Sequence, residues 1–237
     1  MTVYVGCATW AIAAEHDHRL PPGRFRLERY AKRLPATEVN STFHRAHKLA
    51  TWQRWAELTG PSFRFAVKLP REVTHDLRLR DARAAVAKFV DEIAALGPKL
   101  GPVLVQTPPS LEFDADAVAS FLGLLGTHRV VWEPRHESWF SYDADAFLVE
   151  REVARVAADP AKVARAADPG GWPGLRYWRL HGSPRTYHSA YSAEFLASLA
   201  ERLRAETVET WCIFDNTASG AALGNALDLR ELVVERS

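Results

Sequence analysis

Ionisable side chains stand where two apolar runs of the sequence end. The run 130–132 is followed at once by Glu133, Arg135 and His136, and the run 175–180 contains Arg179 and ends before His181. Carboxylates and imidazoles can transfer protons, and guanidinium groups can hold an anion or a polarised carbonyl group. These residue types therefore predict an acid/base site, provided that the fold brings the two segments together.

Other apolar runs end in polar side chains in the same way. These side chains are Glu38, Asn40, Lys68, Gln106 and Asn216. Burying ionisable groups is costly unless they are paired or used for function. A collection of both signs is therefore open to two interpretations, a self-neutralising ion network that holds the fold together or a polar ligand pocket. Because so many strand ends contribute, we favour the pocket.

The chemistry of each residue type suggests its role in that pocket. Glu38 or Glu133 is the candidate base, and His181 or His136 is the candidate proton carrier, because histidine titrates near neutral pH. The segment 182–191 is long for a connection between strand and helix and could cover a ligand. The candidate substrate-binding residues are Trp10, Asn40, Lys68, His75, Gln106, Arg135, Arg179, Tyr187, Tyr191 and Asn216.

Short β-rich runs alternate with helical stretches along the whole chain, which is typical of parallel strands joined by crossover helices. We predict strands at 3–9, 37–41, 63–69, 102–107, 130–135, 153–157, 175–181 and 210–214. We predict helices at 25–34, 50–58, 81–96, 115–125, 143–150, 161–167, 193–203 and 221–234. Eight strands, each followed by a helix, predict one (β/α)₈ TIM barrel over residues 1–237, with its site at the C-terminal ends of the strands. The alternative is an open doubly wound sheet.

The composition indicates a globular protein without a large charged surface. The 237 residues carry 30 basic and 29 acidic side chains, interspersed, for a formal charge of +1. Partners held mainly by charge, such as nucleic acid, are therefore not expected. No apolar run is long enough to cross a membrane and no signal sequence is visible, so we expect a cytoplasmic protein. Cys7 and Cys212 read as buried thiols, and no cofactor or oligomeric state is evident.

Eight short motifs, in order along the chain, resemble those of the YecE-like family, domain of unknown function 72. They are GCATW at 6–10, EVNSTF at 38–43, FRFAVK at 63–68, TH at 74–75, QTPP at 106–109, EPRHESW at 133–139, RLHG at 179–182 and NA at 225–226. The chain departs from the usual motifs at Ala8-Thr9, His44 and Asp215. The resemblance implies a TIM barrel and implies no particular reaction.

Three kinds of function remain open. The first is an enzyme that acts on a small polar or anionic substrate by acid/base chemistry, with Lys68, Arg135 and Arg179 holding the substrate. The second is a metal-dependent hydrolase or isomerase, such as a phosphoesterase, although neighbouring Lys and Arg side chains would repel a cation. The third is a non-catalytic module that binds a ligand, a protein or nucleic acid. We favour the first and assign no metal ligand. The residues from which a metal site would draw are Glu38, Glu133, His75, His136, Asp159, His181 and Asp215.

Overall fold

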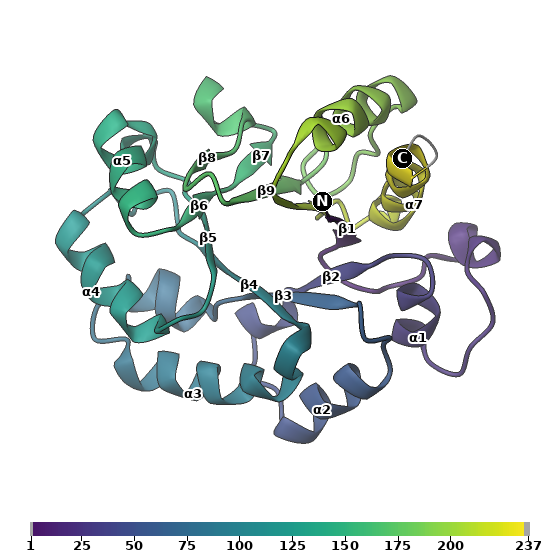
Figure 1. Ribbon diagram of the computed structural model, residues 1–237, viewed down its shortest axis with the longest axis horizontal. Helices are drawn as coiled ribbons and strands as arrows, with labels where there is room; N and C mark the ends of the chain where they lie inside the picture. The colour runs from purple at the N-terminus through teal and green to yellow at the C-terminus, as the bar shows by residue number, and fades with distance from the viewer. Residues whose placement is uncertain (1, 235–237) are drawn as a thin grey trace.

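The strands of the protein form a nearly closed barrel with helices outside it (Figure 1). The computed structural model describes residues 2–234. The strands are β1 (Val3–Cys7), β2 (Ala36–Val39), β3 (Arg64–Lys68), β4 (Leu100–Gln106), β5 (Val130–Glu133), β6 (Ala154–Arg155), β7 (Ala157–Asp159), β8 (Gly170–Gly171), β9 (Leu175–Leu180) and β10 (Glu209–Phe214). The α-helices are α1 (Arg26–Ala31), α2 (Leu49–Glu57), α3 (Arg83–Ile93), α4 (Ala115–Leu125), α5 (Tyr142–Glu150), α6 (Ala193–Ala205) and α7 (Ala221–Val234).

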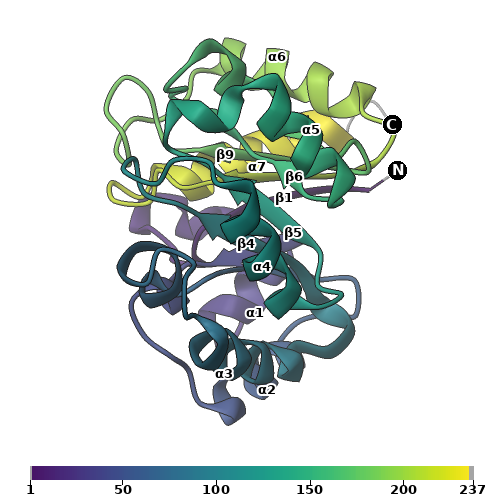
Figure 2. The same cartoon turned by 90° about the vertical axis from the view of Figure 1, so that its left-hand side faces the viewer.

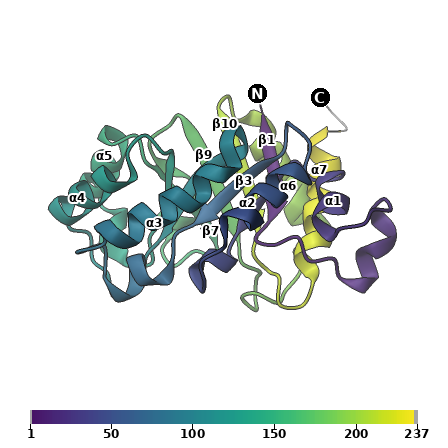
Figure 3. The same cartoon turned by 90° about the horizontal axis from the view of Figure 1, so that it is seen from below.

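The strands pair in parallel in the order β7-β9-β10-β1-β2-β3-β4-β5-β6. The first and last elements of the chain meet, since β1 pairs with β10 and lies beside α7 (Figure 2). On another flank, α2 and α3 lie side by side outside the strands (Figure 3). The predicted TIM barrel is thus confirmed, and the open doubly wound sheet is wrong.

The sixth strand is split between two neighbours. Its first part, β6, pairs with β5, and its second part, β7, pairs with β9. Between them, the Val156 amide donates to the Trp132 carbonyl oxygen at 2.9 Å. The barrel closes through this bend, and the strand predicted at 153–157 is divided into two short strands.

The helix predicted at 161–167 is wrong. This segment forms a 3₁₀ turn over Ala164–Ala167, followed by β8, which pairs antiparallel with β6. Pro160 and Pro169 bound this segment, and proline cannot continue an α-helix. Instead, the buried Arg155 side chain forms a hydrogen bond with the backbone of this segment. Its Nη1 donates to the Arg165 carbonyl oxygen at 2.9 Å.

Local sequence explains where the predicted helices begin and end. Asp114 caps α4 by accepting a hydrogen bond from the Ala117 amide at 3.1 Å, and Gly126 ends this helix with a φ of 59°. Ser192 caps α6 in the same way. Short polar side chains satisfy the free amides of a first helical turn, and glycine adopts positive φ at little cost.

The apolar side chains form two clusters, one on each face of the barrel wall. The larger cluster packs between the strands and the helices. The smaller one fills the lumen, where Tyr177 and Trp211 stack with ring centroids 6.0 Å apart. Small residues on the facing strands make room for these bulky rings, as the packed interior of such a barrel requires. They are Ala8, Ala36 and Ala66, together with Gly101, where a Cβ would run into the Trp211 ring.

Gly6 of β1 is paired with Ala36 of β2. A Cβ at this position would run into the Ala36 carbonyl oxygen and approach the Tyr30 hydroxyl. We therefore expect Gly6→Ala to lower the free energy of unfolding by about 1–3 kcal/mol, because an extra carbon here forces the strands apart. Urea unfolding would measure this change in the free energy of unfolding. Gly123→Ala is the control, since a Cβ there has open space and α4 should gain up to about 1 kcal/mol. Equal effects of the two changes would contradict this prediction.

Candidate functional site

Arg179 lies at the centre of the upper lumen and is fully buried. Its Nε and Nη2 donate to the two oxygens of Glu38 at 3.1 and 2.7 Å. Its Nη1 donates to Glu133 at 2.5 Å, and Nη2 also donates to Asp215 at 3.0 Å. One guanidinium therefore ties together strand ends from three parts of the barrel, using its fixed fork of donors.

Two more side chains complete this cluster. The Tyr177 hydroxyl donates to Glu38 from below at 2.8 Å. The His181 ring lies between two carboxylates, with Nδ1 at 3.0 Å from Asp215 and Nε2 at 2.8 Å from Glu133. We call this set the buried ion network. Its members are Glu38, Glu133, Tyr177, Arg179, His181 and Asp215.

The cations control the ionisation of the acids in the network. Burial alone would raise the pKa of Glu133, but the charges of Arg179 and Arg135 outweigh it and hold that pKa well below its usual value. Burial opposes ionisation of Asp215 too, yet Arg179 and the hydrogen bond from His181 leave its pKa lowered. Both groups are therefore carboxylates at neutral pH. Burial, together with the charge of Glu38, raises the pKa of Tyr177 well above 10.

A pocket of about 510 Å³ opens above the buried ion network at the C-terminal ends of the strands. We call it the mouth pocket. Asp215 belongs to both the pocket and the network, so it is the carboxylate of the network that a ligand would meet. The residues that line the mouth pocket are Asn40, Ser41, Phe43, His44, Lys68, Arg71, His75, Gln106, Tyr187 and Asp215.

Lys68 is the buried cation of the mouth pocket. Its Nζ donates to Gln106 Oε1 at 2.7 Å and lies 4.2 Å from the centre of the Phe43 ring. Within residues 2–234, no carboxylate lies within ion-pair distance of this ammonium group. Burial, and next the charge of Arg179, lower the pKa of Lys68 to about 8.

Asn40 also lines the mouth pocket and has an unused hydrogen-bond acceptor. Its Nδ2 donates to Asp215 Oδ1 at 3.2 Å, which fixes the orientation of the amide. Its Oδ1 is buried and has no hydrogen-bond partner within the described residues. A buried acceptor without a partner is costly, so a donor on a ligand would be favoured here.

The structure brings together most of the residues proposed from the sequence, in two layers. Glu38, Glu133, Arg179 and His181 belong to the buried ion network, and Arg135 joins it through an ion pair with Glu133 at 2.5 Å. The other group lines the mouth pocket above. It consists of Asn40, Lys68, His75, Gln106 and Tyr187.

Four proposed residues lie outside both the buried ion network and the mouth pocket. His136 Nδ1 accepts from the Ser138 amide and so caps a 3₁₀ turn, and Trp10 packs edge-on against Trp55 beside α2. The Tyr191 hydroxyl donates to Asp159 and accepts from the Gly182 amide, each at 2.8 Å. Asn216 Nδ2 donates to Asn225 at 3.0 Å.

Two members of the buried ion network were not proposed as substrate or catalytic residues from the sequence, nor were the pocket-lining Ser41, Phe43, His44 and Arg71. Tyr177 carries a clear signal, because alternation places it on the same face of β9 as Arg179. Asp215 follows β10, and its partners become visible only once β9 and β10 lie side by side. Within the described chain, no group of three or more His, Cys, Asp or Glu side chains is placed to hold a metal ion. Within the same residues, no helix is long and apolar enough to span a membrane.

The sequence matches one protein family over nearly its whole length. The family model described as "Protein of unknown function DUF72" matches residues 4–237. The chain belongs to the DUF72 family. The UPF0759 protein YecE of Escherichia coli is 29% identical over 174 residues, which cover 70% of this chain and 62% of that protein. The UPF0759 protein YunF of Bacillus subtilis is 23% identical, with 98% of this chain and 94% of that protein covered.

Solved structures agree with this membership. A DUF72 family protein from Thermotoga maritima has a TM-score of 0.78 at 26% identity, covering 98% of this chain and 99% of its own. A D-psicose 3-epimerase solved in the presence of D-fructose has a TM-score of 0.55 at 12% identity, covering 99% of this chain and 98% of its own. At that identity the epimerase shares the fold alone.

Proposed function

We propose that the mouth pocket binds a small hydroxy acid and that Lys68 transfers a proton to or from it. The observation that carries this proposal is the environment of Lys68, an almost buried ammonium group whose hydrogen-bond partner is the neutral Gln106. Glu133, Glu38 and Asp215 attract this ammonium group from beyond ion-pair distance and offset only part of the cost of its burial, so an anionic group on a ligand in contact with it would offset more. A carboxylate is the simplest such group.

The unused acceptor on Asn40 refines the ligand. Asn40 lines the same pocket as Lys68, and its buried Oδ1 has no hydrogen-bond partner within the described residues. A hydroxyl group next to the carboxylate of the ligand would donate to it, while the carboxylate meets the ammonium of Lys68. This pair of contacts supports a hydroxy acid over a simple carboxylic acid.

The same geometry supports Lys68 as the group that transfers the proton. Glu38 and Glu133, which the sequence favours as bases, are enclosed by the guanidinium of Arg179 and do not line the mouth pocket. In the unliganded protein, the Lys68 pKa of about 8 leaves both of its protonation states populated close to neutral pH, which suits general acid/base catalysis. The bound carboxylate shifts this balance toward the ammonium form, the state that donates a proton. Asp215 would position the ligand through Asn40.

The first test of this proposal compares two matched ligands. We expect lactate to bind about fivefold more tightly than propionate, because lactate adds one hydroxyl group for Asn40 and a net hydrogen bond is worth about 1 kcal/mol. Binding would be measured by NMR titration. Incubation with a metabolite extract would then search for a hydroxy acid that the protein consumes. If neither carboxylate perturbs the resonances of Lys68 or Asn40, the proposal is wrong.

Binding of lactate should weaken as the pH rises through about 8. The bound anion favours the ammonium form, so deprotonation of Lys68 removes the main attraction, and the Kd should approach a tenfold rise per pH unit above the pKa. Below that pKa, the Kd should be constant, since the lactate carboxylate stays ionised until the pH falls to about 4. A titration series from neutral to alkaline pH measures this. A flat profile through pH 8 would contradict the role given to Lys68.

A further inference from the structure

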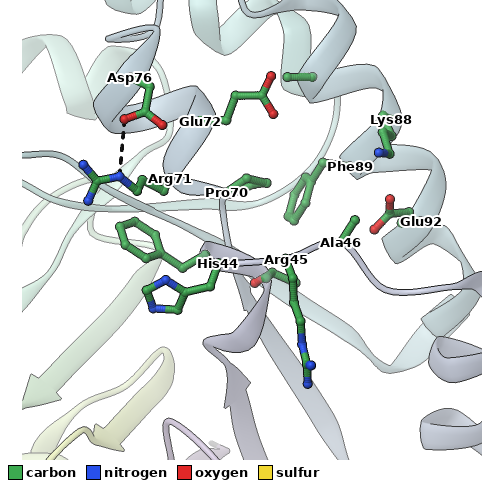
Figure 4. A pocket seen from close by; sticks show the side chains of 13 residues that line it. His44, Arg45, Ala46, Pro70, Arg71, Glu72, Asp76, Lys88, Phe89 and Glu92 are labelled. Carbon is green, nitrogen blue, oxygen red and sulfur yellow. Dashed lines mark ion pairs between the residues drawn. The ribbon is translucent and has the colours of Figure 1, made fainter.

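A second hollow adjoins the mouth pocket, between the segments that follow β2 and β3 and one side of α3 (Figure 4). It encloses about 380 Å³, which is within the range of small-molecule sites. We call it the outer groove. Three residues line both the mouth pocket and the outer groove, so the two hollows meet along a common wall. These residues are Phe43, His44 and Arg71.

Phe43 is the main part of that wall. Its ring carries the Lys68 ammonium 4.2 Å from its centroid, and the His44 and His75 rings meet it edge-on, each at 5.0 Å between centroids. The wall is therefore held in place by a cation and two rings. Phe43, which carries the Lys68 ammonium group, thus also borders the outer groove.

The outer groove has an apolar centre and a balanced charged rim. Figure 4 shows Phe89 and Pro70 at its centre, with charged side chains around them. Arg71 is already paired with Asp76 at 3.3 Å, and Glu92 accepts a hydrogen bond from the His47 amide. The charged residues that line the groove are three cations, Arg45, Arg71 and Lys88, and three anions, Glu72, Asp76 and Glu92.

This balance determines what the groove favours. A further anion on the ligand would meet as many carboxylates as cations and gain little from the rim. An uncharged group would bury apolar surface against Phe43, Phe89 and Pro70. A flat ring suits such a place best, because aromatic side chains pack well against another ring face or edge.

We propose that the hydroxy acid bound in the mouth pocket carries an uncharged aromatic ring, and that this ring lies in the outer groove. This inference rests on the proposed function, since Lys68 anchors the carboxylate end of the same molecule. It narrows the substrate class from small hydroxy acids to aryl-substituted hydroxy acids.

Lactate and phenyllactate provide the test, because they differ by one phenyl ring. Phenyllactate is expected to bind about tenfold more tightly, the gain for roughly 60 Å² of ring surface leaving water. Ala85→Trp and Ala46→Trp fill the groove from opposite walls and should each remove that gain while lactate binding stays the same. Ala87→Trp is the control, an exposed position on the same helix α3 that does not line the groove. Mandelate and a phenyl-substituted hydroxybutyrate would cover other distances between carboxylate and ring.

The outcomes separate the two proposals. If lactate binds but no phenyl compound gains over it, or if the gain survives in both filled variants, the ring site is wrong and the hydroxy-acid site stands. If phenyllactate binds equally well to Lys68→Met and to the unchanged protein, the ring is not part of a molecule anchored at Lys68, and the inference is overturned. If lactate itself does not bind, the proposed function fails first.

Discussion

Arg179→Met is expected to lower the free energy of unfolding by about 3–5 kcal/mol. Arg179 is fully buried and holds Glu38, Glu133 and Asp215 by hydrogen bonds. Methionine has similar length but no charge, so the change would leave three carboxylates close together with little to neutralise them. Removing one partner of a buried ion pair is costly because the remaining charge stays out of water. Urea unfolding at neutral pH measures the loss.

Arg176→Met is the matched control for this experiment. Arg176 lies on the same strand, β9, but on its outer face, and pairs with Glu206 at 3.3 Å with both side chains about a quarter exposed. Such a pair contributes about 0–1 kcal/mol. Similar losses for the two variants would show that Arg179 does not stabilise the lumen in this way.

The difference in free energy of unfolding between the unchanged protein and Arg179→Met should depend on pH, which gives a second check. In the unchanged protein, the pKa values of Glu133 and Asp215 are lowered, so these groups stabilise the fold above their unfolded pKa and lose that contribution as the pH falls. In Arg179→Met the same acids would be protonated more easily, which relieves their repulsion. The gap between the two proteins should therefore narrow as the pH falls from 7 to about 4.

Lys68→Met is expected to lower turnover of the hydroxy-acid substrate by about 10²–10⁴-fold, the usual contribution of a positioned proton-transfer group. It should also abolish the pH dependence near 8, because that dependence comes from the ammonium group. Steady-state kinetics across pH would measure both effects. Lys162→Met, at an exposed position outside the mouth pocket, should leave both unchanged. A folded Lys68→Met protein with unchanged turnover would assign the chemistry to another residue.

Most of the fold could be predicted from the sequence because its periodicity is clear. The helices at 115–125 and 221–234 have the predicted bounds, and the other α-helices begin or end within a few residues of theirs. The segment after β7 differs because a tertiary contact decides it. The side chain of Arg155 satisfies carbonyl groups there, and no local pattern of apolar residues reveals that contact.

The site could be predicted in its composition and only partly in its arrangement. Alternation along β2, β5 and β9 correctly places Glu38, Glu133, Arg179 and His181 on the lumen side. Depth within the lumen depends on how neighbouring strands are staggered, which the sequence of one strand does not contain. For this reason the distinction between the buried Glu38 and the pocket-lining Lys68 required the structure.

The bend in the sixth strand has a consequence for how the barrel opens. The ladder between β5 and β6 has two register pairs, as does the ladder between β1 and β2. The ladder between β1 and β2 is reinforced, because the Tyr30 hydroxyl accepts a hydrogen bond from the Cys7 amide and donates one to the Ala36 carbonyl oxygen. Local opening of a protein follows its weakest cooperative unit. In native-state hydrogen exchange, the amides around Val156 should therefore exchange faster than those in β1 and β10. The barrel should open first between β5 and β6.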